Sequence, residues 1–385
     1  MKIVIFGSGK IGRAFIGQVF GSAGYEVVFV DIDRHMIDLL NQEGQYRVEI
    51  KDNICETLVV KLVRGIHADD ISGIIKEIGE AELVAVSVGL RGLPAVAQSL
   101  AMALESKYML TPERATDIIL AENLRDASMY FARELTLHLS KGFPLETVTG
   151  LIETSIGKMV PVIPEAIMKS EPLVVYAEAY NALIVDGEAF KNPVPKIANL
   201  HPKNNIKAWV DRKSFLHNLG HAMAAYFGNY YRPELVYLYE VLSDRKVEER
   251  TLKAMFEAGE VLKSLHPDEF TREEIEIHIS DLVNRFKNQY LGDTVHRVGC
   301  DLKRKLGPAD RIATPIRYAL DYNIPCQAII EGYKCALTFS AKDEKGLQLL
   351  EDIELKVLYQ ARGLEYMLEK VSDLDPAIGF DLTRD

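Results

Sequence analysis

The segment that decides the fold stands at the start of the chain, where residues 3–12 read IVIFGSGKIG. Its first part, Ile3–Phe6, is apolar without alternation, as expected of a strand covered on both faces of a sheet. Three glycines follow in the spacing G-x-G-x-x-G, and a helical pattern covers residues 10–22. A buried strand, a glycine turn and a helix in this order predict the first unit of a parallel α/β domain.

This glycine turn has the chemistry of a dinucleotide-binding site. Gly7 would permit the tight turn, Gly9 the close approach of a pyrophosphate, and Gly12 the close packing of helix against strand. Amide groups at the helix N-terminus would bind the pyrophosphate oxygens. A glycine-rich turn without a ligand is the alternative, which the strand–turn–helix context disfavours. The predicted cofactor-binding residues of the turn are Gly7, Ser8, Gly9, Lys10, Ile11 and Gly12.

Asp31 indicates which dinucleotide is bound. It ends a second apolar strand, about 20 residues beyond the turn. A carboxylate there accepts the ribose hydroxyl groups of NAD and repels the 2′-phosphate of NADP. The nearby Arg34 would offset part of that repulsion, and we expect NAD to be preferred over NADP.

The first half of the chain continues this alternation of strands and helices. Strands are predicted at Lys2–Phe6, Glu26–Asp31, Tyr46–Ile50, Glu56–Leu62, Leu83–Gly89 and Asp117–Ala121, and helices at Lys10–Ser22, Arg34–Gln42, Ile71–Ile78, Pro94–Leu104 and Asp126–Leu139. The rhythm predicts an α/β fold class with a Rossmann-type, doubly wound sheet. Residues 46–63 are interpreted as a hairpin inserted into this domain.

The second half is predicted to be all-helical. Pro193, Pro195 and Pro202 mark a linker, and helical periodicity prevails from Asn204 onward. Helices are predicted at Asn204–Tyr226, Glu234–Val241, Lys246–Ser264, Arg272–Phe286, Thr294–Arg304, Arg311–Asp321, Pro325–Leu337 and Gly346–Tyr359. We therefore predict an NAD-binding domain at residues 1–192 and an all-α substrate and catalytic domain at residues 193–385.

Composition narrows the classes of function. The 385 residues exceed what one core usually supports, and 48% hydrophobic with 26% charged residues excludes a mainly disordered chain. A net charge of −11 disfavours nucleic-acid binding, which needs a basic surface. No apolar stretch reaches the length of about 20 residues that spans a bilayer, and no signal peptide is recognisable. Four distant cysteines predict reduced thiols and a cytoplasmic location.

A second candidate site lies on the first long helix of the all-α half, where residues 213–221 read KSFLHNLGH. With α-helical spacing, Lys213, Asn218 and His221 fall within roughly 140° of arc. An alcohol dehydrogenase needs a base for the hydroxyl proton and donors for the developing alkoxide. Lysine can be that base if burial or positive charge lowers its pKa, and asparagine amides can be those donors. On spacing alone, a snorkelling lysine and a packing histidine explain the segment better.

Several segments, in the same order, resemble the polyol-specific long-chain dehydrogenase family. They are residues 6–17 (FGSGKIGRAFIG), 121–124 (AENL), 212–222 (RKSFLHNLGHA), 285–291 (RFKNQYL), 295–299 (VHRVG) and 304–311 (RKLGPADR). The resemblance implies a metal-independent dehydrogenase with its site in the cleft between the domains. It implies that Lys213 is the general base, that Asn123 and Asn218 donate to the oxyanion, and that His221 binds substrate.

The resemblance also implies a substrate. Similar enzymes interconvert a hexitol phosphate and a ketose phosphate with NAD, here mannitol 1-phosphate and fructose 6-phosphate. Arg304, Arg311 and Lys158 are predicted to bind the phosphate. Gly157 and Lys158 stand where the family has aspartate and arginine, and Lys10 where related enzymes have asparagine. A free polyol or a hexuronate therefore remains an alternative substrate. We expect a monomer or weak homo-oligomer without nucleic-acid or membrane partners.

Three other classes of function compete. His217 and His221 have the i, i+4 spacing of metal ligands, but a third ligand is missing nearby, and full activity after chelation would exclude zinc. A lysine and an asparagine behind a Rossmann domain also suit hydroxyacid and 6-phosphogluconate dehydrogenases, which product analysis would distinguish. A non-enzymatic NAD-binding protein would form no NADH with any polyol phosphate.

Overall fold

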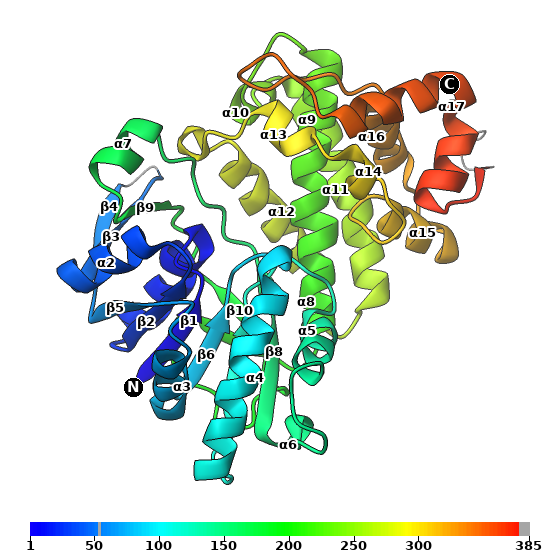
Figure 1. Cartoon of the computed structure of the whole chain (residues 1–385). Coiled ribbons are helices and arrows are strands. Elements are labelled where there is room, and N and C mark those ends of the chain that lie inside the picture. The colour runs from blue at the N-terminus through cyan, green and yellow to red at the C-terminus, as the bar shows by residue number, and fades with distance from the viewer. Residues whose placement is uncertain (53–54, 377–385) are drawn as a thin grey trace. The chain divides into compact units, whose positions relative to one another are not determined.

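The computed structural model of the chain describes residues 1–52 and 55–376. Its contacts form two compact units, Met1–Val210 and Asp211–Asp385, here called the sheet unit and the helical unit (Figure 1). This division falls later than the boundary predicted at residue 193. The reason is that β11 (Leu200–Lys203), which contains Pro202, pairs with β10 (Leu183–Asp186) in the main sheet and is not part of a linker.

The main sheet confirms the predicted Rossmann-type fold class. Its eight strands have the order β11-β10-β8-β7-β6-β1-β2-β5, and the pairs from β5 to β8 are parallel, whereas β10 is antiparallel to β8. The strand order reverses between β1 and β6, which creates the switch point where such sheets bind ligands. The other strands are β1 (Lys2–Phe6), β2 (Glu26–Asp31), β5 (Val63–His67), β6 (Leu83–Val86), β7 (Thr116–Leu120) and β8 (Thr149–Ile156).

Apolar side chains cover both faces of this sheet, as the unalternating strands predict. Ile3 and Ile5 pack on the side of η1 (Gly12–Gly17) and α1 (Gln18–Ser22), whereas Val4 and Phe6 pack on the opposite side. That opposite side is covered by α3 (Ile71–Glu80), α4 (Leu93–Leu110) and α5 (Ala127–Thr136). The remaining helices of the unit are α2 (Arg34–Glu43), η2 (Leu90–Gly92), α6 (Leu145–Val148) and α7 (Glu165–Ser170).

The predicted hairpin forms, but in a sheet of its own. β3 (Gln45–Ile50) pairs antiparallel with β4 (Glu56–Lys61) and parallel with β9 (Val174–Ala177). The Tyr46 hydroxyl donates to the carbonyl oxygen of Arg13 at 2.8 Å, which ties this small sheet to the first helix. Sequence periodicity missed β5, β8, β9, β10 and β11.

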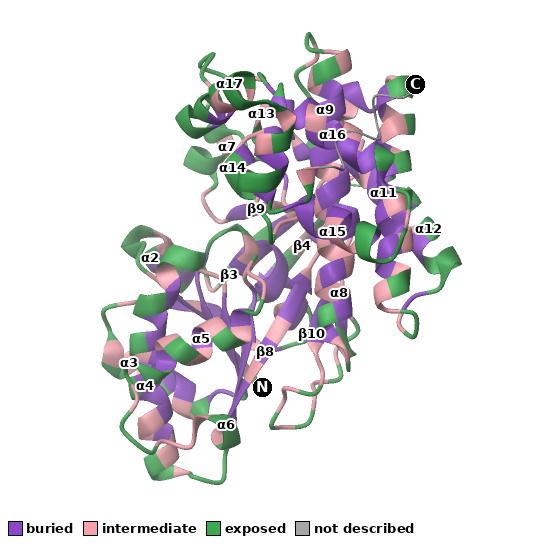
Figure 2. Ribbon diagram, turned by 90° about the vertical axis from the view of Figure 1, so that its right-hand side faces the viewer, coloured by how far each residue is buried: buried purple, intermediate pink, exposed green. Residues whose placement is uncertain are grey.

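The helical unit is built around α9 (Leu219–Tyr231), whose first nine residues are all buried except His221 (Figure 2). Its neighbours include α11 (Arg245–Leu265), α13 (Val295–Gly299) and α16 (Gln327–Leu337). The other helices are α8 (Ile206–Arg212), which leads in from the sheet unit, η3 (Lys213–Asn218), α10 (Leu238–Val241), α12 (Arg272–Phe286), η4 (Gln289–Leu291), α14 (Leu302–Lys305), α15 (Ala313–Asp321) and α17 (Leu350–Ser372).

The helix predicted over residues 294–304 is wrong. It is two short helices, α13 and α14, because Asp301 adopts a left-handed backbone conformation with φ 69°. The break turns the chain so that the Asp352 carboxylate accepts the amides of Asp301 and Leu302.

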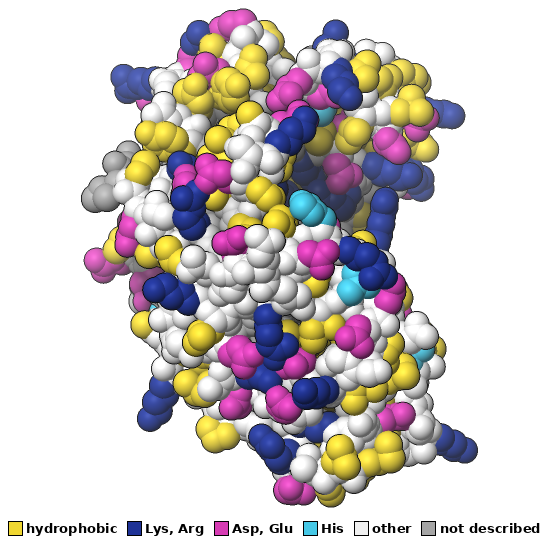
Figure 3. Space-filling view, turned by 60° about the vertical axis from the view of Figure 1, so that its left-hand side comes forward, with side chains coloured by type: hydrophobic (Ala, Val, Ile, Leu, Met, Phe, Trp, Pro, Cys, Tyr) yellow, Lys and Arg dark blue, Asp and Glu magenta, His cyan; other side chains and the backbone are white. Residues whose placement is uncertain are grey.

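Basic and acidic side chains are intermingled over the face shown in Figure 3. Among the described residues, no helix combines the length and apolar character needed to cross a bilayer.

Candidate functional site

The glycine turn after β1 is packed so tightly that two of its glycines cannot be replaced without a shift. Gly7 has φ +97°, and a Cβ atom there would lie 2.5 Å from the carbonyl oxygen of Ser87. A Cβ atom on Gly12 would lie 1.9 Å from the carbonyl oxygen of Gly7. Gly9 differs, because a Cβ atom there would meet nothing within 4 Å. The backbone at Gly9 is therefore open to an incoming group.

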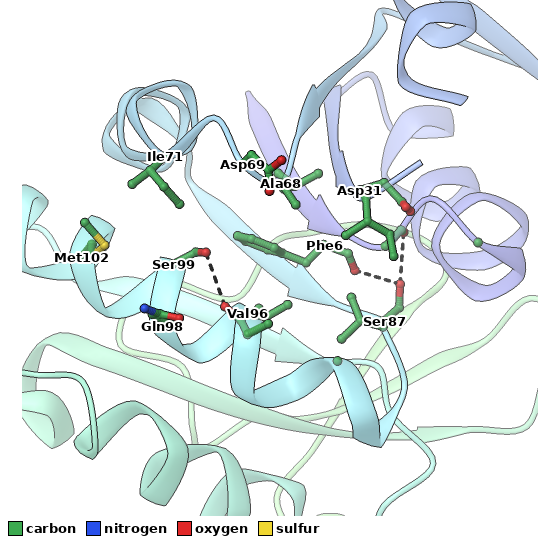
Figure 4. Close-up of a pocket in the computed structure, with 17 residues that line it drawn as sticks. Phe6, Asp31, Ala68, Asp69, Ile71, Ser87, Val96, Gln98, Ser99 and Met102 are labelled. Carbon is green, nitrogen blue, oxygen red and sulfur yellow. Dashed lines mark hydrogen bonds between the residues drawn. The ribbon is translucent and has the colours of Figure 1, made fainter. Parts of the chain in front are cut away.

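A cavity of about 670 Å³ opens beside this turn (Figure 4). Gly7 and Gly9 line it together with Asp31 at the end of β2, Ser87 after β6, and residues of α4. It lies at the carboxyl ends of β1, β2 and β6, which is the switch point of the sheet. The position, the open backbone at Gly9 and the size fit a dinucleotide.

Asp31 is fixed to the turn. One carboxylate oxygen accepts the Ser8 amide at 2.6 Å and the Ser8 hydroxyl at 2.7 Å. Burial alone would raise the pKa of Asp31, but these bonds, together with those from the amides of Asp33 and Ile32, outweigh burial and lower the pKa. A charged carboxylate thus lines the cavity.

The other predicted residues of the turn have different surroundings. Ser8 is buried, Lys10 is exposed, and Ile11 packs against the core of the sheet unit. Sequence reasoning missed Arg13, whose buried guanidinium donates to the carbonyl oxygens of Ser8 at 2.7 Å and Pro172 at 3.0 Å. Arg13 therefore holds the backbone of the turn at Ser8 from the buried side.

Asn123 lies in the turn that follows β7, where it is exposed. The preceding Glu122 accepts the amides of Val88 at 2.7 Å and Gly89 at 2.9 Å. Burial raises the pKa of Glu122, although these amide bonds oppose the effect. Glu122 therefore joins the turns after β6 and β7 and fixes the backbone that carries Asn123.

Lys158 is buried against the first helix of the sheet unit. Its ammonium group donates to the side-chain oxygens of Gln18 at 2.8 Å and Asn181 at 2.7 Å, and it lies 5.3 Å from the centre of the Phe15 ring. These contacts hold the Lys158 side chain against η1 and α1. Its contact with a phosphate stays a prediction.

The segment that carries Lys213 in the helical unit has a π-helical backbone, η3, between α8 and α9. In a π-helix residues i and i+5 are hydrogen-bonded neighbours along the axis, and such turns are frequent at functional sites. Lys213 and Asn218 are therefore brought to one face more closely than the α-helical spacing predicts. The arc of 140° assumed the wrong helix type for this stretch.

Lys213 has the electrostatic surroundings of a base. Lys213 is only partly exposed, and the burial of its amine lowers the pKa to about 8. The positive charge of Arg311 contributes to this decrease, and Asp310 opposes it. An appreciable fraction of the amine is therefore uncharged near neutral pH, as proton transfer requires.

His221 is held by a carboxylate that sequence reasoning missed. Its Nε2 atom lies 3.0 Å from Oδ2 of the buried Asp293, and the other oxygen of Asp293 pairs with Arg297. The imidazole also stacks on Phe286, with ring centres 4.8 Å apart and planes inclined by 20°. Asp293 and Phe286 thus fix the orientation of His221.

The other histidine of this segment, His217, is buried. Burial, followed by the charge of Arg285, lowers its pKa well below the usual value. The rings of His217 and His221 are 6.1 Å apart and roughly perpendicular. In the part of the chain that the structure describes, no group of three or more His, Cys, Asp and Glu residues is placed to hold a metal ion.

The two arginines predicted to bind phosphate, Arg304 and Arg311, share one acidic partner. Asp310 accepts the Arg311 side chain at 2.7 Å and the Arg304 side chain at 3.2 Å. Arg304 also pairs with Asp301. Arg311 is mostly buried and acts on Lys213, whereas about half of the Arg304 side chain is exposed. The structure thus brings Arg311 to Lys213 and places Arg304 further out.

Comparison with known proteins identifies the class of enzyme. Models of the mannitol dehydrogenase Rossmann domain and C-terminal domain match residues 1–199 and 205–375. The mannitol-1-phosphate 5-dehydrogenase of Halalkalibacterium halodurans is 32% identical over 381 residues, which are 98% of this chain and 97% of that protein. The chain is an NAD-dependent oxidoreductase that acts on CH–OH groups. The chain belongs to the mannitol dehydrogenase family.

Two solved structures share the fold. A substrate-free D-sorbitol dehydrogenase gives a TM-score of 0.80 at 18% identity, covering 99% of this chain and 90% of that one. The mannitol 2-dehydrogenase of Pseudomonas fluorescens, in complex with NAD and D-mannitol, gives 0.66 at 15% identity, covering 93% and 84%. The family assignment favours a polyol dehydrogenase over the hydroxyacid dehydrogenases and the non-enzymatic binding protein considered from sequence.

Proposed function

We propose that the protein interconverts mannitol 1-phosphate and fructose 6-phosphate with NAD, without a metal ion. The observation that carries the chemistry is the lowered pKa of Lys213 beside Arg311. The 32% identity with a mannitol-1-phosphate 5-dehydrogenase supports the substrate.

The residues at the glycine turn fit NAD. Gly9 leaves open backbone where the pyrophosphate would lie, and Asp31 presents a charged carboxylate toward the ribose. NAD, when bound, takes up the hydride from the carbon that carries the reacting hydroxyl group.

The chain's own residues handle the proton and the developing charge. During oxidation the uncharged amine of Lys213 accepts the hydroxyl proton, and in reduction its ammonium group returns that proton to the carbonyl oxygen. The amides of Asn123 and Asn218 donate to the negatively charged oxygen. His221, oriented by Asp293, forms a hydrogen bond with the substrate.

A free polyol or a hexuronate is the second candidate substrate. It is favoured by the acids around the predicted phosphate ligands, since Asp301 and Asp310 neutralise much of the charge of Arg304 and Arg311. A phosphate must compete with these carboxylates.

Kinetics on mannitol 1-phosphate and mannitol distinguish the two substrates. We expect a higher kcat/KM for the ester. We also expect Arg304→Ala or Arg311→Ala to raise the KM for the ester about tenfold, since a charge-assisted bond is lost, and to change the KM for mannitol little. Arg311→Ala should in addition move the pH profile upward, because the pKa of Lys213 is no longer lowered by that charge. Arg272→Ala, which removes an exposed arginine paired with Glu260, is the control. Equal kinetics on both substrates in the unmodified protein would overturn the phosphate assignment.

Replacing Asp31 should weaken the preference for NAD. Asp31→Ser removes the charge that would repel a 2′-phosphate, so we expect the ratio of kcat/KM for NAD over NADP to fall about tenfold. Asp38→Ser, on the exposed side of α2, is the control for loss of one charge. An unmodified protein that uses NADP as efficiently as NAD would contradict the role of Asp31.

Replacing Asp293 tests how His221 is positioned. Asp293→Asn keeps the shape but not the charge, and we expect kcat to fall about 10- to 100-fold, since a hydrogen bond to a charged group contributes about 1.5–3 kcal/mol. The Kd for NAD and the Tm should change little, and Asp293→Glu should restore part of the activity. The exposed Asp321→Asn is the control. A large fall in Tm that accompanies the fall in activity would show that Asp293 has a structural role only.

A further inference from the structure

A second cavity of the sheet unit, of about 290 Å³, lies at the amino ends of central strands of the main sheet, whereas the glycine turn lies at their carboxyl ends. It is bordered by the residues that precede β1, β6 and β7, by the last turns of α4, and by residues 192–195. It shares no lining residue with the cavity beside Gly9. The two cavities are therefore separate spaces.

Lys107 of α4 brings a buried ammonium group to this cavity. The residue is only 4% exposed. Within residues 1–52 and 55–376 its ammonium group has one hydrogen-bond acceptor, the carbonyl oxygen of Ala81 at 3.2 Å. An ammonium group has three donors, and leaving donors unsatisfied in a buried place is costly. The cavity is where a further acceptor can enter.

Two more donors line the same cavity. Arg114 is exposed, and its guanidinium group has no hydrogen bond or ion pair with any described residue. Tyr25 is 4% exposed, and its hydroxyl group likewise lacks a hydrogen-bond partner in the described part of the chain. An ammonium, a guanidinium and a phenol group thus face one small space.

The carboxylates that line the cavity are engaged elsewhere. Asp117 is fully buried and accepts the amides of Lys191 at 2.8 Å and Asn192 at 3.1 Å, as well as the Asn192 side chain at 2.8 Å. Glu82 accepts the amide of Lys2. Over the described residues, neither acid lies within 4.0 Å of the Lys107 ammonium group.

The charge of Lys107 is correspondingly uncompensated. Burial, followed by the positive charge of Arg114, lowers the pKa of Lys107 to about 8, against the opposing effects of Asp117 and Glu82. The negative charge of a bound anion would offset this decrease, because it stabilises the ammonium form of Lys107.

We propose that this cavity binds a small anion through a phosphate group, held by Lys107 and Arg114 with a hydrogen bond from Tyr25. Phosphate offers several acceptors for charge-assisted bonds, and both lysine and arginine bind it in proteins. The volume accommodates phosphate with few additional atoms and excludes a nucleotide, whose sites are larger. The ligand is inorganic phosphate or a small phosphate ester.

Calorimetric titration with inorganic phosphate tests this site apart from the proposed substrate site. The titration uses the full chain carrying Arg304→Ala and Arg311→Ala, which removes the two arginines proposed to bind the phosphate of the substrate. Binding should persist in this background and raise the Tm. Adding Arg114→Gln, at an exposed position, should weaken binding about tenfold, and adding Lys107→Gln at least as much. Lys141→Gln, an exposed lysine outside the cavity, should leave binding unchanged.

The outcomes separate the two sites and the two sources of phosphate. Tighter binding of fructose 6-phosphate than of inorganic phosphate in the same background would identify an ester as the ligand, and the reverse would identify the free ion. Either result supports the site if Arg114→Gln weakens it. Absence of binding, or binding unaffected by both Lys107→Gln and Arg114→Gln, would overturn the proposal while leaving the proposed function intact.

Discussion

Lys213→Ala is expected to lower kcat for polyol oxidation about 10²- to 10⁴-fold, the contribution that a positioned general base makes. Alanine removes the amine that would accept the hydroxyl proton. The glycine turn and Asp31 belong to the sheet unit and Lys213 to the helical unit, so the Kd for NAD should stay the same. Steady-state NADH formation and calorimetric titration with NAD measure the two quantities separately.

The pH profile distinguishes a lost base from a damaged helix. In the unmodified protein the oxidation rate should rise with pH and level off above about 8, because the pKa of Lys213 is lowered to about 8 and only the uncharged amine accepts a proton. The residual rate of Lys213→Ala should lack this step. Lys207→Ala, at an exposed position of α8, is the matched control. Undiminished turnover with an unchanged profile would refute the assignment, as would loss of NAD binding in a folded variant.

Gly9→Ala is expected to weaken NAD binding about 100-fold without loss of stability. Its Cβ atom meets nothing within 4 Å in the protein itself, so the fold should tolerate the substitution. The methyl group would occupy the space through which the pyrophosphate approaches the backbone, and the amide contacts there would be lost. Calorimetric titration with NAD measures the Kd, and thermal unfolding measures the Tm.

Two other glycines serve as comparisons. Gly79→Ala on α3 also meets open space, and it should leave NAD binding unchanged while stabilising the helix slightly. Gly12→Ala should lower both stability and NAD affinity, because its Cβ atom would lie 1.9 Å from the Gly7 carbonyl oxygen. Normal NAD affinity in Gly9→Ala would show that the pyrophosphate does not approach at Gly9.

Local sequence pattern was sufficient to predict several elements of both units. Lys2–Phe6 and Glu26–Asp31 form strands with the predicted bounds, and Arg272–Phe286 forms the predicted helix. Their signals are apolar runs and helical periodicity, which depend on neighbours in sequence. Strand β9 was not predicted because Val174–Ala177 is short and because its partner, β3, lies far from it in the sequence.

For the candidate site, too, some features follow from the local sequence and others from the tertiary structure. Apolar runs and helical periodicity were enough to predict the Rossmann-type sheet followed by a helical half. Lys213, Asn218 and His221 were proposed through the family resemblance, because their spacing alone favoured a packing role. Only the tertiary structure decided that η3 is π-helical, that Arg311 lowers the pKa of Lys213, and that Asp293, 72 residues further on, holds His221. A pKa depends on burial and on charges near in space, and separation along the chain does not specify either.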